Sequence, residues 1–149
     1  MAALKAIGVL AALVYVASVS GAAMTSSAES VYTKAQAERG LTVYADHCLR
    51  CHGEDLESAR GGTEYGIPSP PLAGRLFLLQ WDGKGVDELF TLVQTTMPKN
   101  VTSRLTPEQY ADVVAFLLQQ NEFPEGEAEL PADPVRLKTI RLAVDPHER

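Results

Sequence analysis

The sequence predicts an all-α fold, and two observations carry that prediction. Three segments place apolar side chains three and four residues apart, which is the spacing of one face of a helix. No stretch of useful length alternates apolar and polar residues as a half-buried strand does, and no internal repeat is present. The chain has 149 residues, enough for one domain, because a domain usually takes about 100–200 residues.

The first helix is predicted over Thr33–His47. Thr33 and Gln36 have the spacing of a capping box, in which each of the two side chains binds a free backbone N–H at the start of the helix. One stripe along this helix contains Ala37, Gly40, Leu41, Tyr44 and Cys48.

Two more helices are predicted nearer the carboxy-terminus. One runs from Val86 to Gln94, with apolar residues at Val86, Leu89, Phe90 and Val93. The other starts at Thr106, where Pro107 suits the first helical position and Gln109 completes a capping box, and it ends at Gln120. Its stripe contains Tyr110, Val113, Val114 and Leu117, widened by Phe116 and Leu118. A stripe this wide indicates that the last helix packs against two elements.

The helical pattern fails between Gly53 and Gly85, a stretch rich in glycine and proline. An irregular stretch of this length is uncommon inside a compact domain. It becomes reasonable if a large, flat, apolar cofactor completes the core and the backbone wraps around it.

The amino-terminal residues have the pattern of an export signal. Lys5 precedes an unbroken apolar run over residues 6–17, and small residues follow as far as Ala23. We expect a signal peptide over residues 1–23, cleavage after Ala22 or Ala23, a periplasmic mature protein and no stable membrane insertion after cleavage. The alternative is an uncleaved anchor, although a spanning helix needs about 20 apolar residues.

Composition narrows the class of protein further. There are 13 basic and 19 acidic side chains, a formal net charge of −6, 46% hydrophobic residues and 21% charged residues. These proportions are those of a folded protein. The acidic balance argues against nucleic-acid binding, which needs clustered Lys and Arg to displace counterions from phosphates.

Cys48-Leu49-Arg50-Cys51-His52 is a C-x-x-C-H sequence, which is typical of c-type haem attachment. Cysteines three residues apart on a helical turn face the same way, so each can form a thioether with one haem vinyl group. The next residue, His52, then presents its imidazole to the iron. The alternatives are a thioredoxin-type redox pair, which needs a βαβ context, and a structural zinc site, which needs four ligands.

With these features the chain resembles the class I monohaem cytochromes c, over roughly residues 32–120. Members have a first helix that ends at C-x-x-C-H, a Pro-x-Leu segment, a Met-Pro loop and a last helix. The matching segments here are Thr33–His47, Pro70-Pro71-Leu72, Met97-Pro98 and Thr106–Gln120. The resemblance implies a cytochrome c fold of three to five helices wrapped around one covalently bound haem. It also implies that the first and last helices cross at Gly40, Tyr44, Val113 and Phe116, with Gly40 allowing close backbone approach.

The resemblance also implies the iron ligands and their surroundings. Met97 would bind the iron opposite His52, since Met1 and Met24 lie in or beside the signal peptide. The alternatives are that Met97 is a core filler or that His47 is the ligand. Pro70 would offer its carbonyl to His52, or else be a plain turn residue. Leu72 would lie against the haem, and Trp81, Tyr65 and Arg75 are candidates to contact the propionates.

These expectations describe an electron carrier with no catalytic residue of its own, because both axial positions of the iron would be filled by the protein. We expect redox protein partners, with a dehydrogenase as donor and an oxidase or another cytochrome as acceptor. The alternative is the cytochrome subunit of a periplasmic alcohol or sulfur-compound oxidoreductase. Trp81-Asp82-Gly83 and the tail after Asn121 loosely resemble cytochromes associated with quinoprotein dehydrogenases.

The tail and its charges complete the predicted organisation. Residues 24–121 form the cytochrome domain, and residues 122–149 form an extension that packs on it. Between Glu108 and Asp133 lie seven acidic residues and no Lys or Arg. This run is a solvated face that favours solubility, or else a surface that steers docking. In the second interpretation, basic residues flank the haem edge near Met97, namely Arg75, Lys84, Lys99 and Arg104.

Overall fold

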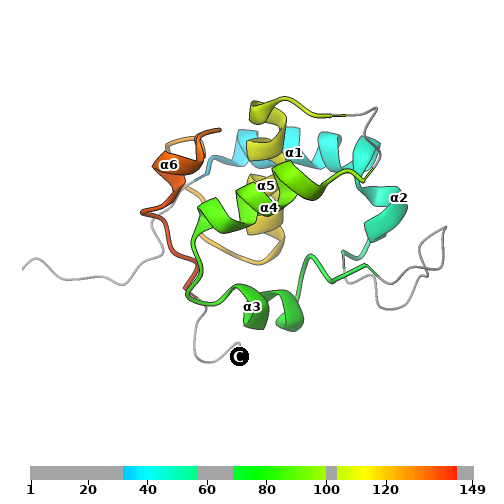
Figure 1. The fold of residues 1–149 in the computed structure, drawn as a ribbon, viewed down its shortest axis with the longest axis horizontal. Helices are drawn as coiled ribbons and strands as arrows, with labels where there is room; N and C mark the ends of the chain where they lie inside the picture. Colours follow the sequence, from blue (N-terminus) through cyan, green and yellow to red (C-terminus); the bar gives the residue numbers. More distant parts are fainter. Residues whose placement is uncertain (1–31, 57–68, 100–103, 144–149) are drawn as a thin grey trace, which may run out of the picture.

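The structure, a computed structural model, describes residues 32–56, 69–99 and 104–143 (Figure 1). Its helices are α1 Lys34–His47, α2 Leu49–His52, α3 Arg75–Trp81, α4 Val86–Thr96, α5 Pro107–Gln120 and α6 Pro134–Leu137. Within the described ranges the β-type pairing is one isolated bridge between Gly85 and Arg141. The predicted all-α class is confirmed. The predicted signal peptide lies outside the described residues.

The crossing of α1 and α5 is the main packing contact of the fold. A Cβ atom at Gly40 would lie 1.9 Å from the carbonyl oxygen of Asp112 and 2.8 Å from the Cβ atom of Phe116. Beside this contact the rings of Tyr44 and Phe116 pack with their centroids 5.2 Å apart. The two helices therefore approach closely because residue 40 has no side chain, as predicted.

Half of the capping box predicted for α1 is wrong. Thr33 Oγ1 accepts a hydrogen bond from the Gln36 N–H at 3.1 Å, as the prediction requires. The Gln36 side chain, however, is buried and pairs with the backbone of Leu130 in both directions, over 3.0 and 2.7 Å. A buried amide needs partners for its donor and its acceptor, and the Leu130 backbone supplies both.

The capping box of α5 is confirmed. Thr106 Oγ1 accepts from the Gln109 N–H at 3.2 Å, and Gln109 Oε1 accepts from the Thr106 N–H at 2.9 Å. Every side chain from Tyr110 to Leu118 is buried, and α5 packs against both α1 and α4. The prediction that this helix contacts two elements is therefore correct. The helix predicted over 86–94 extends two residues further, to Thr96.

The prediction of a wholly irregular stretch between 53 and 85 is wrong for α3. Phe77, Leu78 and Trp81 are buried, while Leu76 and Leu79 are 60% and 45% exposed. Because apolar residues occupy both faces of this two-turn helix, the sequence shows no clear helical period there. In the view of Figure 1, α3 lies at the bottom of the molecule, below α4.

Residues 122–143 pack on the core that α1, α3, α4 and α5 form. Phe123, Leu130, Leu137 and Leu142 are buried in the same cluster as residues of α3, α4 and α5. Backbone hydrogen bonds from Gly83 N–H to the Leu142 carbonyl (2.7 Å) and from Leu142 N–H to the Lys84 carbonyl (2.9 Å) join the tail to the α3–α4 loop. The division of the chain at residue 122 stays a prediction.

Two members of the acidic run are paired with one basic side chain. Arg39 on α1 donates to Asp112 over 3.1 and 2.9 Å and to Glu129 over 2.9 Å. Asp112 is buried at the crossing of α1 and α5, whereas Glu129 is exposed. Part of this run therefore has a structural role, which reduces the charge available for steering a partner.

No helix in the described ranges combines the length and the apolar character that crossing a membrane requires.

Candidate functional site

A cavity of about 710 Å³ lies among the end of α1, α2, the segment 69–72, α3, α4 and α5. Most of the residues that line it are apolar. The predicted site residues among them are Cys48, Cys51, His52, Pro70, Leu72, Trp81 and Met97. The structure therefore brings all seven predicted cofactor-binding residues to one cavity, although they come from four separate parts of the chain.

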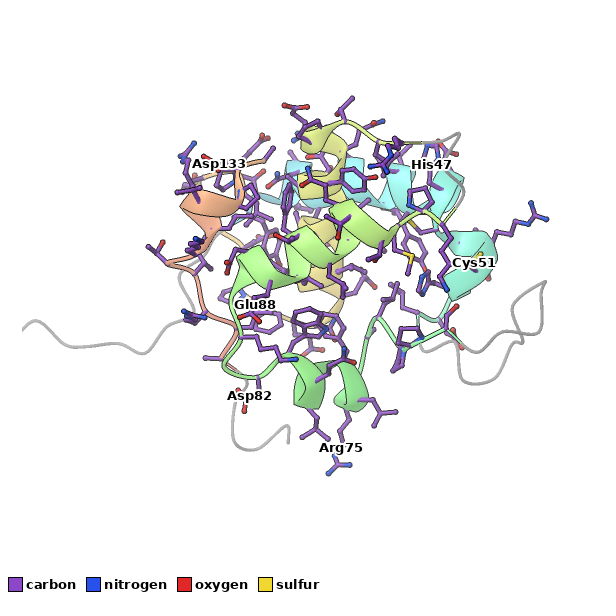
Figure 2. The ribbon with its side chains drawn as sticks, in the orientation of Figure 1. His47, Cys51, Arg75, Asp82, Glu88 and Asp133 are labelled. Atoms are coloured by element: carbon purple, nitrogen blue, oxygen red, sulfur yellow. The ribbon has the colours of Figure 1, made fainter. Side chains whose placement is uncertain are left out.

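One wall of the cavity is the C-x-x-C-H turn. The Cys48 N–H donates to the Tyr44 carbonyl at 2.8 Å, and the His52 N–H donates to the Cys48 carbonyl at 2.9 Å, so α2 follows α1 almost without a break. The Tyr44 hydroxyl donates to the Gly53 carbonyl at 2.6 Å and closes the turn. Cys51 lies on this turn (Figure 2) and is exposed, whereas Cys48 is half-buried.

His52 is buried in this wall and is held in its neutral form. Burial lowers its pKa, and the positive charge of Lys99 lowers it further, while the backbone carbonyl of Pro70 raises it. Its Nδ1 atom is buried and has no hydrogen-bond partner within good geometry among the described residues. A neutral imidazole is the form that binds a metal ion.

Cys48 does not have the character of a reactive redox cysteine. Burial raises the pKa of Cys48 to about 11, and the neighbouring Cys51 adds to the effect. A reactive cysteine of the thioredoxin type has a lowered pKa instead, and it occurs in a βαβ context that this all-α fold lacks. The geometry therefore disfavours the redox-pair alternative.

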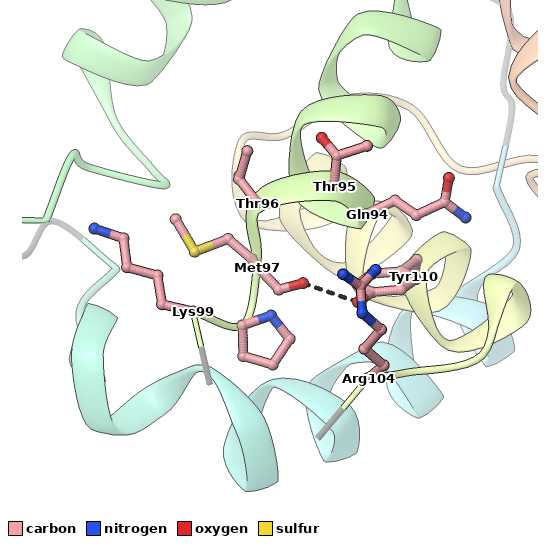
Figure 3. Close-up of a pocket in the computed structure, with 8 residues that line it drawn as sticks. Gln94, Thr95, Thr96, Met97, Lys99, Arg104 and Tyr110 are labelled. Atoms are coloured by element: carbon pink, nitrogen blue, oxygen red, sulfur yellow. Dashed lines mark hydrogen bonds between the residues drawn. The ribbon is translucent and has the colours of Figure 1, made fainter. Parts of the chain in front are cut away.

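Met97 lines the cavity from the end of α4 rather than from the C-x-x-C-H turn. Its N–H donates to the Val93 carbonyl at 2.9 Å, and its own carbonyl accepts from the Tyr110 hydroxyl at 2.8 Å (Figure 3). His47, the alternative ligand, is an exposed residue at the rim of the cavity, next to Cys48. Met97 and His52 thus reach the cavity from two different elements.

Pro70, Leu72 and Trp81 complete the lining. Leu72 is held by its own N–H, which donates to the Leu56 carbonyl at 2.7 Å. Trp81 is buried at the end of α3, and the ammonium group of Lys84 lies 5.0 Å from the centroid of its ring.

The other expected contacts are distributed differently from the prediction. Arg75 is exposed, extends away from the body of the molecule (Figure 2) and does not line the cavity. Of the four basic residues expected near Met97, Lys99 lines the cavity, Arg104 lines a smaller cavity behind Met97, and Arg75 and Lys84 line neither. That Arg75 and Lys84 flank the haem edge therefore stays a prediction. Tyr65 lies outside the described residues.

Two residues that support the site were missed by the sequence analysis. Tyr110 was assigned only to the apolar stripe of α5, yet its hydroxyl holds the Met97 carbonyl. Asn121 is buried at the end of α5, where it donates to the carbonyls of Leu72 (2.9 Å) and Leu117 (2.8 Å) and accepts from the Gly74 N–H (3.1 Å). For Asn121, the only signal in the sequence was its position directly after the predicted last helix.

The residues of the cavity fit a haem group. The lining is mostly apolar, as a porphyrin ring requires. Two thiols lie on one turn of its wall, next to a buried imidazole, and a thioether approaches from another element. This donor set of thiols, imidazole and thioether is the set found in c-type cytochromes.

Comparison with known proteins gives the same result. Residues 35–117 match the family described as "Cytochrome C oxidase, cbb3-type, subunit III". The cbb3-type cytochrome c oxidase subunit CcoP of Cereibacter sphaeroides is 31% identical over 78 residues, which cover 52% of this chain and 25% of that protein. The chain thus corresponds to about a quarter of the relative that it matches. No solved structure shows a significant match.

The matched residues include the single C-x-x-C-H sequence, so the domain is a cytochrome c domain with one covalently attached haem c, a domain of the electron-carrier type. Since the match extends over more than half of the chain, this protein belongs to the cytochrome c family of cbb3-type oxidase subunit III.

Proposed function

We propose that the protein is an exported electron carrier in which Cys48 and Cys51 hold the haem covalently while His52 and Met97 bind its iron. The observation that carries this proposal is that the C-x-x-C-H turn and Met97 line one apolar cavity from different elements. When bound, the haem supplies an iron that cycles between Fe(II) and Fe(III). Because His52 and Met97 would both bind the iron, substrate would have no open site on it and the protein would have no catalytic residue.

The proximal residues orient the imidazole. We assign Nε2 of His52 to the iron and Nδ1 to the carbonyl of Pro70, which already acts on the pKa of His52. This assignment gives a partner to Nδ1, which is buried and has no hydrogen-bond partner among the described residues. Such a bond fixes the orientation of the ring and makes it a stronger ligand.

The remaining site residues control the environment of the haem. The thioether of Met97 favours the reduced, less charged iron and so raises the potential. Leu72 excludes water from one face of the haem. Trp81 directs the polar edge of its indole ring toward a propionate, since an indole N–H seeks an acceptor.

We further propose that residues 1–23 are a cleaved signal, which places the protein in the periplasm. Residues 24–121 are then the cytochrome domain, and residues 122–149 are an extension packed on it. The burial of Phe123, Leu130, Leu137 and Leu142 supports the last part of this assignment.

The partners follow from the role of a carrier. We propose a dehydrogenase as the donor and a respiratory oxidase or another cytochrome as the acceptor. The name of the Cereibacter sphaeroides relative, a subunit of a cytochrome c oxidase, favours an oxidase as the acceptor. Contacts of this kind are small and brief, so charge acts mainly on the association rate.

The Met97→Ala variant tests the ligand assignment. A redox titration of the haem-loaded wild type should show one reversible one-electron step and, in the oxidised protein, the weak methionine–iron band at the red end of the spectrum. Met97→Ala should lose that band, lower the midpoint potential and let cyanide bind readily, because one axial position becomes open. An unchanged potential together with unchanged cyanide binding would refute the assignment.

The same family match favours a second candidate function, in which the chain is the haem subunit of a larger oxidoreductase. Similarity to the Cereibacter sphaeroides subunit favours an oxidase as that complex. The loose resemblance of the tail favours a quinoprotein or sulfur-compound dehydrogenase instead. Purification of the haem-loaded protein from its native membrane and periplasmic fractions separates the two functions. A carrier elutes alone, whereas a subunit elutes with the other chains in constant ratio.

A further inference from the structure

Tyr110 makes a hydrogen bond that the proposed function does not use. It lies in the first turn of α5, and its side chain is 3% exposed. Its hydroxyl donates to the carbonyl of Met97 at 2.8 Å, across 13 positions of the chain (Figure 3). The bond joins the best-packed helix of the domain to the residue that supplies the thioether.

The backbone at Met97 needs such a partner. Met97 is the C-terminal cap of α4, and carbonyl groups at the end of a helix find no N–H donor within the helix itself. The N–H of Met97 is already bound to the Val93 carbonyl at 2.9 Å. Tyr110 therefore restrains the other polar group of the same residue, and the two bonds together define where its side chain begins.

Packing holds this segment less firmly than it holds α5. Residues 96–99 line the cavity of about 710 Å³ on one side and a second cavity of about 110 Å³ on the other. The hydroxyl of Tyr110 reaches Met97 from the side of the smaller cavity, which Tyr110 also lines. With space on that side, a directional hydrogen bond matters more than side-chain contacts in keeping Met97 at the larger cavity.

We propose that Tyr110 is a positioning residue whose hydroxyl holds Met97 at the iron and sets how readily an external ligand replaces the thioether. The proposal rests on the proposed function, because it requires Met97 to be the axial ligand. It extends that function by assigning control of the ligand to a residue on a different helix.

The test is the rate of cyanide binding to the full-length, haem-loaded, oxidised protein. Tyr110→Phe keeps the buried ring and removes only the hydroxyl. We expect this variant to bind cyanide about fivefold faster, which is the effect of one lost neutral hydrogen bond on the population with Met97 displaced. The methionine–iron band should also disappear at a lower temperature in this variant than in the wild type.

Tyr32→Phe is the matched control. Tyr32 is 2% exposed, its hydroxyl donates to the backbone carbonyl of Phe123, and it lines neither cavity. Both variants should lose a similar part of the free energy of unfolding in guanidinium, but Tyr32→Phe should bind cyanide at the wild-type rate. An equal acceleration in both variants, or none in Tyr110→Phe, would overturn the proposal.

Met97→Ala separates this proposal from the one on which it rests. If Met97→Ala binds cyanide no better than the wild type, Met97 is not the ligand and the proposed function itself fails. If Met97→Ala behaves as expected while Tyr110→Phe matches Tyr32→Phe, the ligand assignment stands and only the role of Tyr110 is refuted.

Discussion

The two sides of the cavity that present iron-binding groups are built in different ways. The C-x-x-C-H side is continuous with α1, and most of its hydrogen bonds join residues at most nine positions apart, such as the Tyr44 hydroxyl and the Gly53 carbonyl. One bond reaches further, from the Ser69 hydroxyl to the Cys51 carbonyl at 3.0 Å. The Met97 side depends on α5, because Tyr110 reaches its carbonyl from another helix. Mainly local structure therefore forms the first side, whereas the second exists only once α4 and α5 have packed together.

This difference has a consequence for how the cavity responds to mutation. Substitutions in α1 and α2 affect the C-x-x-C-H side, whose hydrogen bonds lie mostly within a short segment of the chain. Damage to the contacts of α5 affects the Met97 side and the 72–74 segment together, since Tyr110 holds the first and Asn121 holds the second. In the part of the chain that the structure describes, both sides depend on the crossing of α1 and α5.

Gly40→Val should have the largest effect, because it removes the contact that both sides share. Its Cβ atom would lie 1.9 Å from the carbonyl oxygen of Asp112, and a backbone atom cannot move aside as the end of a side chain can. We expect a loss of about 3 kcal/mol or more in the free energy of unfolding, measured in guanidinium on the haem-loaded protein.

Leu41→Val is the control for this variant, because Leu41 is the next residue on the same helix and is 52% exposed. It should change the free energy of unfolding by only about 0.5 kcal/mol. If Gly40→Val were as stable as the wild type, α1 and α5 could move apart without a cost in free energy. The close contact of these helices would then not be what both sides of the cavity depend on.

Asn121→Ala should come next, because it affects only the part of the cavity that depends on α5. The substitution leaves the Leu72 carbonyl and the Gly74 N–H without their side-chain partner. We expect the free energy of unfolding to fall by about 2–3 kcal/mol, since buried polar groups left unpaired are costly. Gln120→Ala, one residue earlier and exposed, should cost less than about 0.5 kcal/mol. Equal losses in the two variants would contradict a special role for Asn121.

Tyr44→Phe should have the smallest effect and should be visible mainly in the pH dependence. Burial raises the pKa of Tyr44, and the negative charge of Asp55 raises it further, so the folded protein keeps this phenol neutral. In the unfolded chain it ionises near pH 10. The unfolded state therefore loses the proton first, and the free energy of unfolding falls as the pH rises above about 10.

Guanidinium unfolding between pH 8 and pH 11 measures this effect. Tyr44→Phe should show a shallower fall above pH 10 than the wild type, and near neutral pH it should cost about 1 kcal/mol for the lost hydrogen bond to Gly53. If the free energy of unfolding fell equally with pH in both proteins, burial would not raise the pKa of Tyr44. The hydrogen bond from Tyr44 to Gly53 would then hold the C-x-x-C-H turn less firmly than its geometry indicates.

Local patterns in the sequence predicted much of the fold, and together with the family resemblance they predicted seven of the residues that line the cavity. The start of α5 was predicted to the residue, because Thr106, Pro107 and Gln109 satisfy the end of a helix by themselves. The close approach at Gly40 was also predicted through the family resemblance, since a glycine among bulky residues on one helical stripe leaves room for a crossing backbone. Both signals act within one or two helical turns, and this range is where sequence patterns are informative.

Predictions that depended on distant partners were less successful. Gln36 had the right spacing for a capping box, but it bonds with Leu130, 94 positions away. Arg75 and Lys84 were expected to flank the haem edge near Met97, and neither of them lines the cavity. Nothing in the spacing of these residues shows which distant backbone group will be nearby after folding.

The sequence by itself determined the cofactor and how it is attached, because two cysteines and a histidine on one helical turn need no other part of the chain to face the same way. Only the tertiary structure decided how the Met97 side is held, through Tyr110 of α5, and how the 72–74 segment is joined to the same helix, through Asn121. The physical reason is that a hydrogen bond between distant residues forms only after hydrophobic packing has brought their helices together, and packing depends on the whole chain at once.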